Sequence, residues 1–238
     1  MLPVRALLLA AGTGSRLRPF TEILPKCLMP IKGRPLLEYW LCTLYQNGIK
    51  DVLVNMHHLY QSIDAYLDRQ QFSNWVRGVY EPELLGTAGT LYANMPHLQR
   101  HTTLLAHADN WCQCNFQEFL EFHLNYRPAG TIMTMMTFRT CTPTACGIVE
   151  IDDRGVVENF YEKVSDPPNN LANGAVYLLE SEVLTWLAKR PPVRDFSTEI
   201  LPKLLGQIAT WENTQIHRDI GTIDALLAAQ HDSQPDLC

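Results

Sequence analysis

The sequence predicts an α/β protein with a Rossmann-like, mixed and mainly parallel sheet that is flanked by helices. Over the first 130 residues, apolar runs alternate with segments of helical periodicity, which is typical of βαβ crossover units. After residue 130 strand-like runs follow one another with few helices between them. We therefore expect one domain over residues 1–238, with a more antiparallel half from 131 to 238.

The elements of the first half follow from local pattern. Residues 4–10 form a largely apolar run, as in a strand that is buried on both faces. Residues 34–47 place apolar side chains at helical spacing, with proline near the start and glycine just past the end. The other expected elements are strands at 51–55, 76–80 and 102–107 and helices at 58–70, 87–95 and 115–126, the last opened by an Asn115/Glu118 capping box.

The second half is expected to be richer in strands. Its strand-like runs are residues 131–138, 146–151, 156–161 and 172–179. The sequence Asp-Asp-Arg-Gly at 152–155 is typical of a tight turn, which predicts a hairpin. Helical patterns return at 182–189, 198–205 and 222–230.

Composition excludes several classes of protein. The 238 residues include 25 acidic and 19 basic side chains, for a net charge of −6, and no Lys/Arg cluster that would favour nucleic acid. No apolar run approaches the roughly 18 residues of a membrane span, so we expect no membrane partner. The seven cysteines are an odd number in a chain long enough to fold without disulfides, which indicates reduced thiols and a cytoplasmic location.

The loop after the first strand carries the strongest functional signal. In open α/β sheets, ligands bind at the loop that follows the C-terminal end of the first strand. Gly12 and Gly14 would let the backbone approach a phosphate, and Arg16 and Lys26 would add positive charge. Leu17 replaces the third glycine of a dinucleotide fingerprint, and no Gly-Lys-Ser/Thr follows. From two glycines alone, an ordinary turn without a ligand is an equal alternative.

The same segment resembles a family signature. The run LAAGTGSRLRPFT at 9–21, followed by LPK at 24–26, is similar to the motif of the sugar-1-phosphate nucleotidyltransferases, also called NDP-sugar pyrophosphorylases. The chain departs from that motif at Ser15, where the family prefers Thr, and at Cys27, where Pro is common. The resemblance continues in order along almost the whole chain, through LGTAG at 85–89, Asp109, Glu162-Lys163, Asn173-Gly174 and RDIGT at 218–222.

The resemblance implies a reaction. A sugar 1-phosphate oxygen would attack the α-phosphorus of a nucleoside triphosphate, and pyrophosphate would leave. Because that nucleophile is already an anion, catalysis rests on alignment and on neutralising crowded phosphates. The resemblance further implies Mg²⁺ as cofactor, held by Asp109 and Asp219. It makes residues 1–130 the nucleotide-binding half and 131–238 the sugar-phosphate-binding half.

The resemblance also assigns roles to individual residues. Taken from the residues alone, Asp109 and Asp219 could be exposed turn carboxylates, Glu162-Lys163 a surface ion pair, and Gly147 a strand bulge. The assigned sets are catalytic Arg16, Lys26 and Lys163; nucleotide-binding Leu9, Ala10, Ala11, Gly12, Gly14, Glu81, Gly86, Thr87 and Ala88; and sugar-phosphate-binding Gly147, Glu162, Lys163 and Asn173.

Several alternatives stay open. The LGTAG motif resembles mannose-1-phosphate guanylyltransferases and slightly favours GTP, whereas the Ala-Ala-Gly loop is common in uridylyltransferases that use a sugar or amino-sugar 1-phosphate. A cytidylyltransferase for phosphocholine or a phosphonate is a further enzyme candidate. A catalytically silent, nucleotide-sugar-binding regulatory subunit is the alternative from another class, and it would be expected to lack one of the charged residues. No hexapeptide repeat is present, so we expect no β-helix extension, and a homo-oligomer remains possible.

Overall fold

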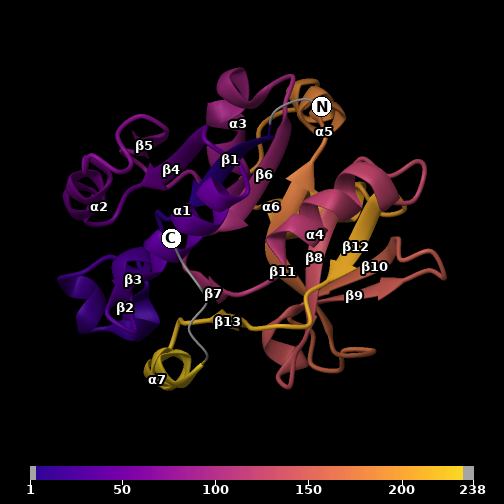
Figure 1. Cartoon of the computed structure of the whole chain (residues 1–238). Coiled ribbons are helices and arrows are strands. Elements are labelled where there is room, and N and C mark those ends of the chain that lie inside the picture. The colour runs from indigo at the N-terminus through magenta and orange to yellow at the C-terminus, as the bar shows by residue number, and fades with distance from the viewer. Residues whose placement is uncertain (1–3, 233–238) are drawn as a thin grey trace. The chain divides into compact units, whose positions relative to one another are not determined.

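The computed structural model describes residues 4–232 (Figure 1). The chain forms two compact units, and each is built from segments that are separated in the sequence. The N-terminal unit contains residues 4–84, 106–114 and 215–232, and the central unit contains residues 85–105 and 115–214. The expected change near residue 130 falls inside the central unit.

The N-terminal unit is built on parallel strands with helical crossovers. Strand β1 (Val4–Leu9) pairs with β4 (Val52–Met56), which pairs with β5 (Val76–Tyr80), and both pairings are parallel. Helices α1 (Leu36–Gln46) and α2 (Tyr60–Leu67) lie between these strands in the sequence. The βαβ pattern expected from the alternation of apolar runs and helical segments is therefore confirmed.

Short strands complete the N-terminal unit. Strands β2 (Pro30–Ile31) and β3 (Arg34–Pro35) form one antiparallel pair. Strands β7 (Asn110–Cys112) and β13 (His217–Asp219) form another, with Asn110 opposite Asp219. None of these four strands was expected from the sequence. Helix α7 (Ile223–His231) follows, and the Thr222 hydroxyl caps it by accepting from the Ala225 N–H at 3.2 Å.

The central unit contains the more antiparallel strands. Strand β8 (Met133–Arg139) pairs antiparallel with β11 (Leu171–Leu179), and β9 (Gly147–Ile151) pairs antiparallel with β10 (Val157–Glu162). The expected turn between β9 and β10 is confirmed, because the Gly155 N–H donates to the Asp152 carbonyl at 2.9 Å. Strand β12 (Ile208–Glu212) was not expected, and it pairs parallel with β8.

The central unit also contains helices, and their ends can be compared with those expected from the sequence. The Asn115 side chain accepts from the Glu118 N–H at 3.2 Å, so the expected N-cap is confirmed. The helix expected at 198–205 is wrong as a continuous element. A 3₁₀ turn at Leu201–Lys203 follows the short helix α6 (Phe196–Glu199) and contains Pro202, which lacks a backbone donor. The helices of this unit are α3 (Gly86–Leu98), α4 (Phe116–Glu121) with a π-helical turn at Phe122–Tyr126, α5 (Ser181–Ala188) and α6 (Phe196–Glu199).

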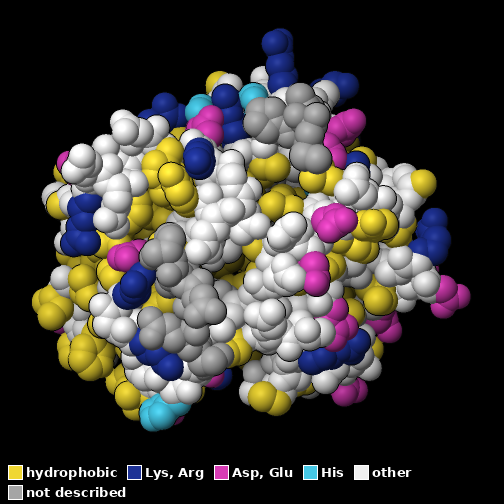
Figure 2. Space-filling model, in the orientation of Figure 1, with side chains coloured by type: hydrophobic (Ala, Val, Ile, Leu, Met, Phe, Trp, Pro, Cys, Tyr) yellow, Lys and Arg dark blue, Asp and Glu magenta, His cyan; other side chains and the backbone are white. Residues whose placement is uncertain are grey.

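The mixed sheet and its helices confirm the expected α/β class. Strand β6 (Thr102–His107) contributes its first residues to the central unit and its last two to the N-terminal unit. Within residues 4–232, no helix combines the length and apolar character needed to cross a bilayer. Lys and Arg side chains are interspersed with Asp and Glu on the face shown in Figure 2.

Candidate active site

Four charged side chains meet in the N-terminal unit. Lys26 Nζ lies 3.0 Å from Asp109 Oδ2 and 2.6 Å from Asp219 Oδ1. Arg16 Nη2 lies 2.8 Å from Asp219 Oδ2. The structure thus brings together four of the charged residues that the sequence singled out, and we call these four the charged cluster.

Each member of the charged cluster comes from a different segment. Arg16 lies in the 3₁₀ turn Ser15–Leu17 that follows the glycine loop, and Lys26 begins another such turn. Asp109 lies between β6 and β7, and Asp219 ends β13. The pairing of β7 with β13 brings the chain beside Asp109 next to Asp219, which explains how two carboxylates so far apart in sequence reach the same ammonium group.

Burial and charge fix the protonation states of two members. The Lys26 side chain is 7% exposed. Burial on its own would lower the pKa of Lys26, but the ion pairs with Asp109 and Asp219 outweigh it and leave that pKa raised. Burial would raise the pKa of Asp219, but Lys26 and Arg16 outweigh it and leave that pKa lowered. Lys26 and Asp219 are therefore both charged at neutral pH.

Glycines allow the loop and its neighbours to approach the charged cluster. Gly14 has φ 60°, a left-handed conformation that favours glycine. Its carbonyl accepts from Thr21 Oγ1 at 2.9 Å. A Cβ atom at Gly12 would lie 3.6 Å from Asp109 Oδ2, so the loop backbone lies beside the cluster. A Cβ at Gly221 would overlap the Arg16 guanidinium. Glycine at this position therefore leaves room for the Arg16 side chain.

A buried asparagine that the sequence analysis missed holds the start of the loop. Asn55 Oδ1 accepts from the N–H groups of Ala10 and Ala11 at 2.6 and 3.2 Å. Asn55 Nδ2 donates to Glu81 Oε1 at 3.0 Å, and Asn55 and Glu81 are 3% and 2% exposed. Two loop N–H groups are thus engaged by Asn55. The available signal was a polar residue at the end of a strand expected to be buried.

The charged cluster has a donor set suited to a divalent cation. Asp109 and Asp219 already share one cationic group, the Lys26 ammonium. Two carboxylates, with water and substrate phosphates, are what Mg²⁺ commonly uses in enzymes. Within residues 4–232, no three or more His, Cys, Asp or Glu side chains gather as a metal site by themselves. The residues present therefore fit a metal whose coordination includes substrate.

In the central unit, three of the expected sugar-phosphate residues lie together. Gly147 is opposite Glu162 in the β9–β10 pair, and a Cβ at Gly147 would lie only 2.7 Å from Glu162 Oε2. Lys163 Nζ lies 3.3 Å from Glu162 Oε1, and the Lys163 side chain is 64% exposed. Asn173 follows Ala172, which pairs antiparallel with Ile148, so its backbone lies opposite Gly147.

The side chain of Asn173 is held within its own strand. Its Nδ2 donates to the Tyr177 hydroxyl at 2.7 Å, and its Oδ1 accepts from the Ala175 N–H at 2.9 Å. Both bonds lie where the β8–β11 register shifts, and Ala175 has φ 52° there. Asn173 thus shapes this bulge.

The segment expected to cradle the nucleoside opens α3. Gly86 has φ 80°, and the Ala88 N–H donates to the Arg194 carbonyl at 2.9 Å. Thr87 Oγ1 accepts from the Phe196 N–H at 2.7 Å. These contacts anchor the helix start to the segment before α6. Leu9, the remaining expected residue, is 8% exposed at the end of β1.

Comparison with known proteins identifies the family. The sequence profile of the nucleotidyl transferase family matches residues 5–235, and the chain belongs to this family. Relatives include the mannose-1-phosphate guanylyltransferase of Mycobacterium tuberculosis, 29% identical over 226 residues, or 92% of this chain and 61% of the relative. The mannose-1-phosphate guanylyltransferase catalytic subunit beta of Drosophila melanogaster is 28% identical, over 91% of this chain and 59% of the relative.

A third relative carries a different nucleotide in its name. The UTP–glucose-1-phosphate uridylyltransferase of Synechocystis is 28% identical, over 85% of this chain and 55% of the relative. The chain therefore spans between 55% and 61% of the length of these three relatives.

Solved structures support the fold. A proposed glucose-1-phosphate thymidylyltransferase from Bacillus anthracis, in complex with sucrose, superposes with a TM-score of 0.84 at 19% identity and covers 98% of both chains. HddC from Yersinia pseudotuberculosis, in complex with GMP-PN, gives a TM-score of 0.78 at 21% identity and covers 97% of this chain and 98% of that one.

Proposed function

We propose that the chain transfers a nucleotidyl group from a nucleoside triphosphate to a sugar 1-phosphate, forming an NDP-sugar and pyrophosphate. The observation that carries this proposal is the convergence of Arg16, Lys26, Asp109 and Asp219 beside the glycine loop. The names of the relatives support a sugar 1-phosphate as the second substrate.

The residues of the charged cluster have distinct proposed roles. Arg16 and the loop backbone beyond Ala11 hold the triphosphate, because the N–H groups of Ala10 and Ala11 already donate to Asn55. Lys26 supplies a second cation from a buried position, where its charge is poorly screened. The sugar phosphate oxygen needs no strong base, so alignment and charge neutralisation account for the rate.

Mg²⁺ is the proposed cofactor, and Asp109 and Asp219 would hold it. When bound, it would offset the negative charge of the reacting phosphates. Asp219 also keeps Arg16 in place through their 2.8 Å contact, so it would orient a phosphate-binding side chain as well as hold the cation.

GTP is the nucleotide that the site favours. Glu81 is buried. Its Oε1 accepts a hydrogen bond from Asn55, which also holds the loop, and carboxylate oxygens are hydrogen-bond acceptors. Guanine presents N1–H and a 2-amino group side by side, whereas uracil presents one ring N–H between two carbonyls. A carboxylate therefore suits guanine better, and two of the relatives described above are named for guanylyl transfer. UTP is the second candidate because of the Synechocystis relative.

In the central unit, Lys163 is the proposed partner of the sugar phosphate, and Glu162 the proposed partner of sugar hydroxyls. An exposed ammonium with one carboxylate neighbour can turn to a dianionic phosphate at little cost. Gly147 leaves the space that the Glu162 carboxylate occupies.

The six cysteines within the described residues are free thiols, which supports a cytoplasmic setting for this reaction.

A pyrophosphate-release screen tests the proposal. The common nucleoside triphosphates would be tested against a panel of sugar 1-phosphates with Mg²⁺. We expect GTP to react fastest, with mannose 1-phosphate among the acceptors. If no pair releases pyrophosphate, the proposal is wrong and the silent regulatory subunit replaces it.

The base preference has its own variant. Glu81→Gln keeps the side-chain length and an acceptor for Asn55, but it exchanges one carboxylate oxygen for a donor. We expect the ratio of kcat/KM for GTP over UTP to fall by about tenfold. An unchanged ratio would remove Glu81 from base selection without affecting the proposed reaction.

A further inference from the structure

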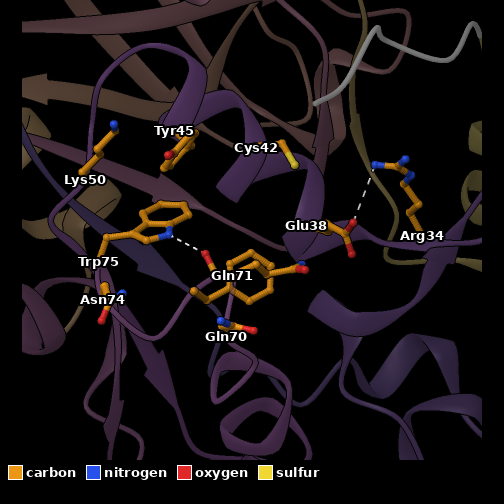
Figure 3. Close-up of a pocket in the computed structure, with 10 residues that line it drawn as sticks. Arg34, Glu38, Cys42, Tyr45, Lys50, Gln70, Gln71, Asn74 and Trp75 are labelled. Carbon is orange, nitrogen blue, oxygen red and sulfur yellow. Dashed lines mark hydrogen bonds and ion pairs between the residues drawn. The ribbon is translucent and has the colours of Figure 1, made fainter.

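The N-terminal unit contains a cavity that the proposed reaction does not use. Its volume is about 730 Å³, within the roughly 300–1,000 Å³ typical of small-molecule sites. It lies between one face of α1 and the segment that connects α2 to β5, with Lys50 at one end and Arg34 at the other (Figure 3). No member of the charged cluster lines it.

Aromatic rings form the middle of this cavity. The ring centroids of Tyr45 and Trp75 lie 5.2 Å apart with their planes at 53°, and Phe72 packs beside Trp75 at 6.1 Å. Trp75 Nε1 donates to the Gln71 carbonyl at 2.7 Å, which fixes the indole. Tyr45 is 45% exposed. A fixed indole beside a partly exposed phenol ring offers a planar apolar molecule faces to pack against.

The charges at the two ends of the cavity differ. Glu38 is the carboxylate among the described lining residues. It lies 3.6 Å from Arg34 and also accepts from the Tyr66 hydroxyl. Lys50 Nζ instead lies 4.4 Å above the Tyr45 ring, where the contact is a cation–π interaction and not a carboxylate pair. The cavity therefore has one surplus positive charge, beside its aromatic faces.

We propose that this cavity is a second ligand site, which takes a small planar aromatic molecule with one anionic group. The ring packs on Tyr45 and Trp75, and the anion pairs with Lys50. Side-chain amides at the rim, from Gln70, Gln71 and Asn74, hydrogen-bond polar atoms on the edge of the ring. The charge and the aromatic surface together select the ligand, so neither a neutral ring nor a small anion satisfies both.

Calorimetry with simple probes separates these contributions. The main probe is 1-naphthalenesulfonate, and its matched controls are 1-naphthol, which has the ring without the sulfonate, and methanesulfonate, which has the anion without the ring. We expect each control to bind at least about tenfold more weakly than the main probe. Binding is measured without turnover, so its outcome does not depend on the proposed reaction.

Variants then locate the probe. Lys50→Met and Trp75→Leu should each weaken 1-naphthalenesulfonate binding by roughly fivefold, whereas Lys189→Met, at an exposed lysine in the central unit, should not. The proposal is overturned by undetectable binding, by equal binding of 1-naphthol, or by wild-type affinity in Lys50→Met. Lys50 is exposed, so this substitution should not disturb the fold.

Discussion

The charged cluster and the Glu162–Lys163 pair are both held by ion pairs, but they differ in burial and in the distance along the sequence between the partners. Lys26 is 7% exposed and contacts carboxylates that lie 83 and 193 residues away. Lys163 is 64% exposed and contacts the residue before it. Breaking a buried pair leaves a charge without its partner, whereas an exposed pair contributes little to stability. Function and stability should therefore be linked in the charged cluster and separable in the central unit.

Replacing Lys26 tests that link most strongly. In Lys26→Met, Asp109 and Asp219 lose their shared cation. We expect the free energy of unfolding to fall by about 2 kcal/mol, below the roughly 3–5 kcal/mol of a fully buried pair because Asp219 is half exposed and retains Arg16. Pyrophosphate release should fall by about a thousandfold. Urea unfolding measures the change in stability, and a turnover assay measures the change in rate. If Lys26→Met were as stable as the wild type, the charged cluster would not stabilise the fold.

The same variant should respond to metal more strongly than the wild type. With the ammonium removed, the two carboxylates repel each other, and a divalent cation relieves that repulsion. We expect added Mg²⁺ to raise the melting temperature of Lys26→Met by more than that of the unaltered protein. Equal shifts in the two proteins would contradict a shared cation position.

Asn55 links stability to function without carrying charge. Asn55→Ala removes the Oδ1 acceptor of the Ala10 and Ala11 N–H groups and the Nδ2 donor to Glu81 Oε1. We expect a loss of about 2 kcal/mol in the free energy of unfolding and a raised KM for the nucleotide. The matched control is Asn159→Ala at an exposed position, which should stay within about 0.5 kcal/mol.

Acid should remove the contribution of Asp219. Its folded-state pKa is lowered by Lys26 and Arg16, against the opposing effect of burial, relative to about 3.9 in an unfolded chain. A carboxyl whose pKa is lowered in the folded state stabilises the fold at any pH above its unfolded-state pKa. That stabilisation is lost as the pH falls through its folded-state pKa. Asp219→Asn should therefore be less stable than the wild type at pH 7 and nearly equal to it near the acid limit of folding. A constant difference across pH would contradict this assignment.

The central unit should give the smallest change in stability. Lys163→Met removes an exposed ammonium beside Glu162, so we expect the free energy of unfolding to stay within about 0.5 kcal/mol. The KM for the sugar 1-phosphate should rise by about tenfold while that for the nucleotide holds. A parallel rise in both KM values would remove the proposed division between the two substrates.

Local patterns explain what the sequence could predict. Strands β5 and β6 occupy the residues expected for them, 76–80 and 102–107, and the members of the charged cluster stand in or beside contiguous motifs. Strand β13 has only three residues, all of them charged or polar (His217, Arg218 and Asp219), and its partner β7 lies far away in sequence. Asn55 is one polar residue in a short strand. Such features depend on long-range pairing, which neither periodicity nor composition records.

The aromatic cavity illustrates the same limit. Tyr45 fits the helical spacing of α1, and Trp75 stands alone in a connecting segment. Their contact at 5.2 Å arises because α1 and the α2–β5 connection pack together. Tyr45 and Trp75 thus form one aromatic surface only once the chain is folded.

Turnover in Asp109→Asn tests the role of the charged cluster most directly. The matched control is Asp51→Asn, since Asp51 forms an ion pair with Arg5 in the same unit at 2.6 Å. With Mg²⁺ and the fastest substrate pair, we expect Asp109→Asn to release pyrophosphate about a thousandfold more slowly, with circular dichroism unchanged, and Asp51→Asn to match the wild type. Near-normal pyrophosphate release by a folded Asp109→Asn would contradict the proposed site.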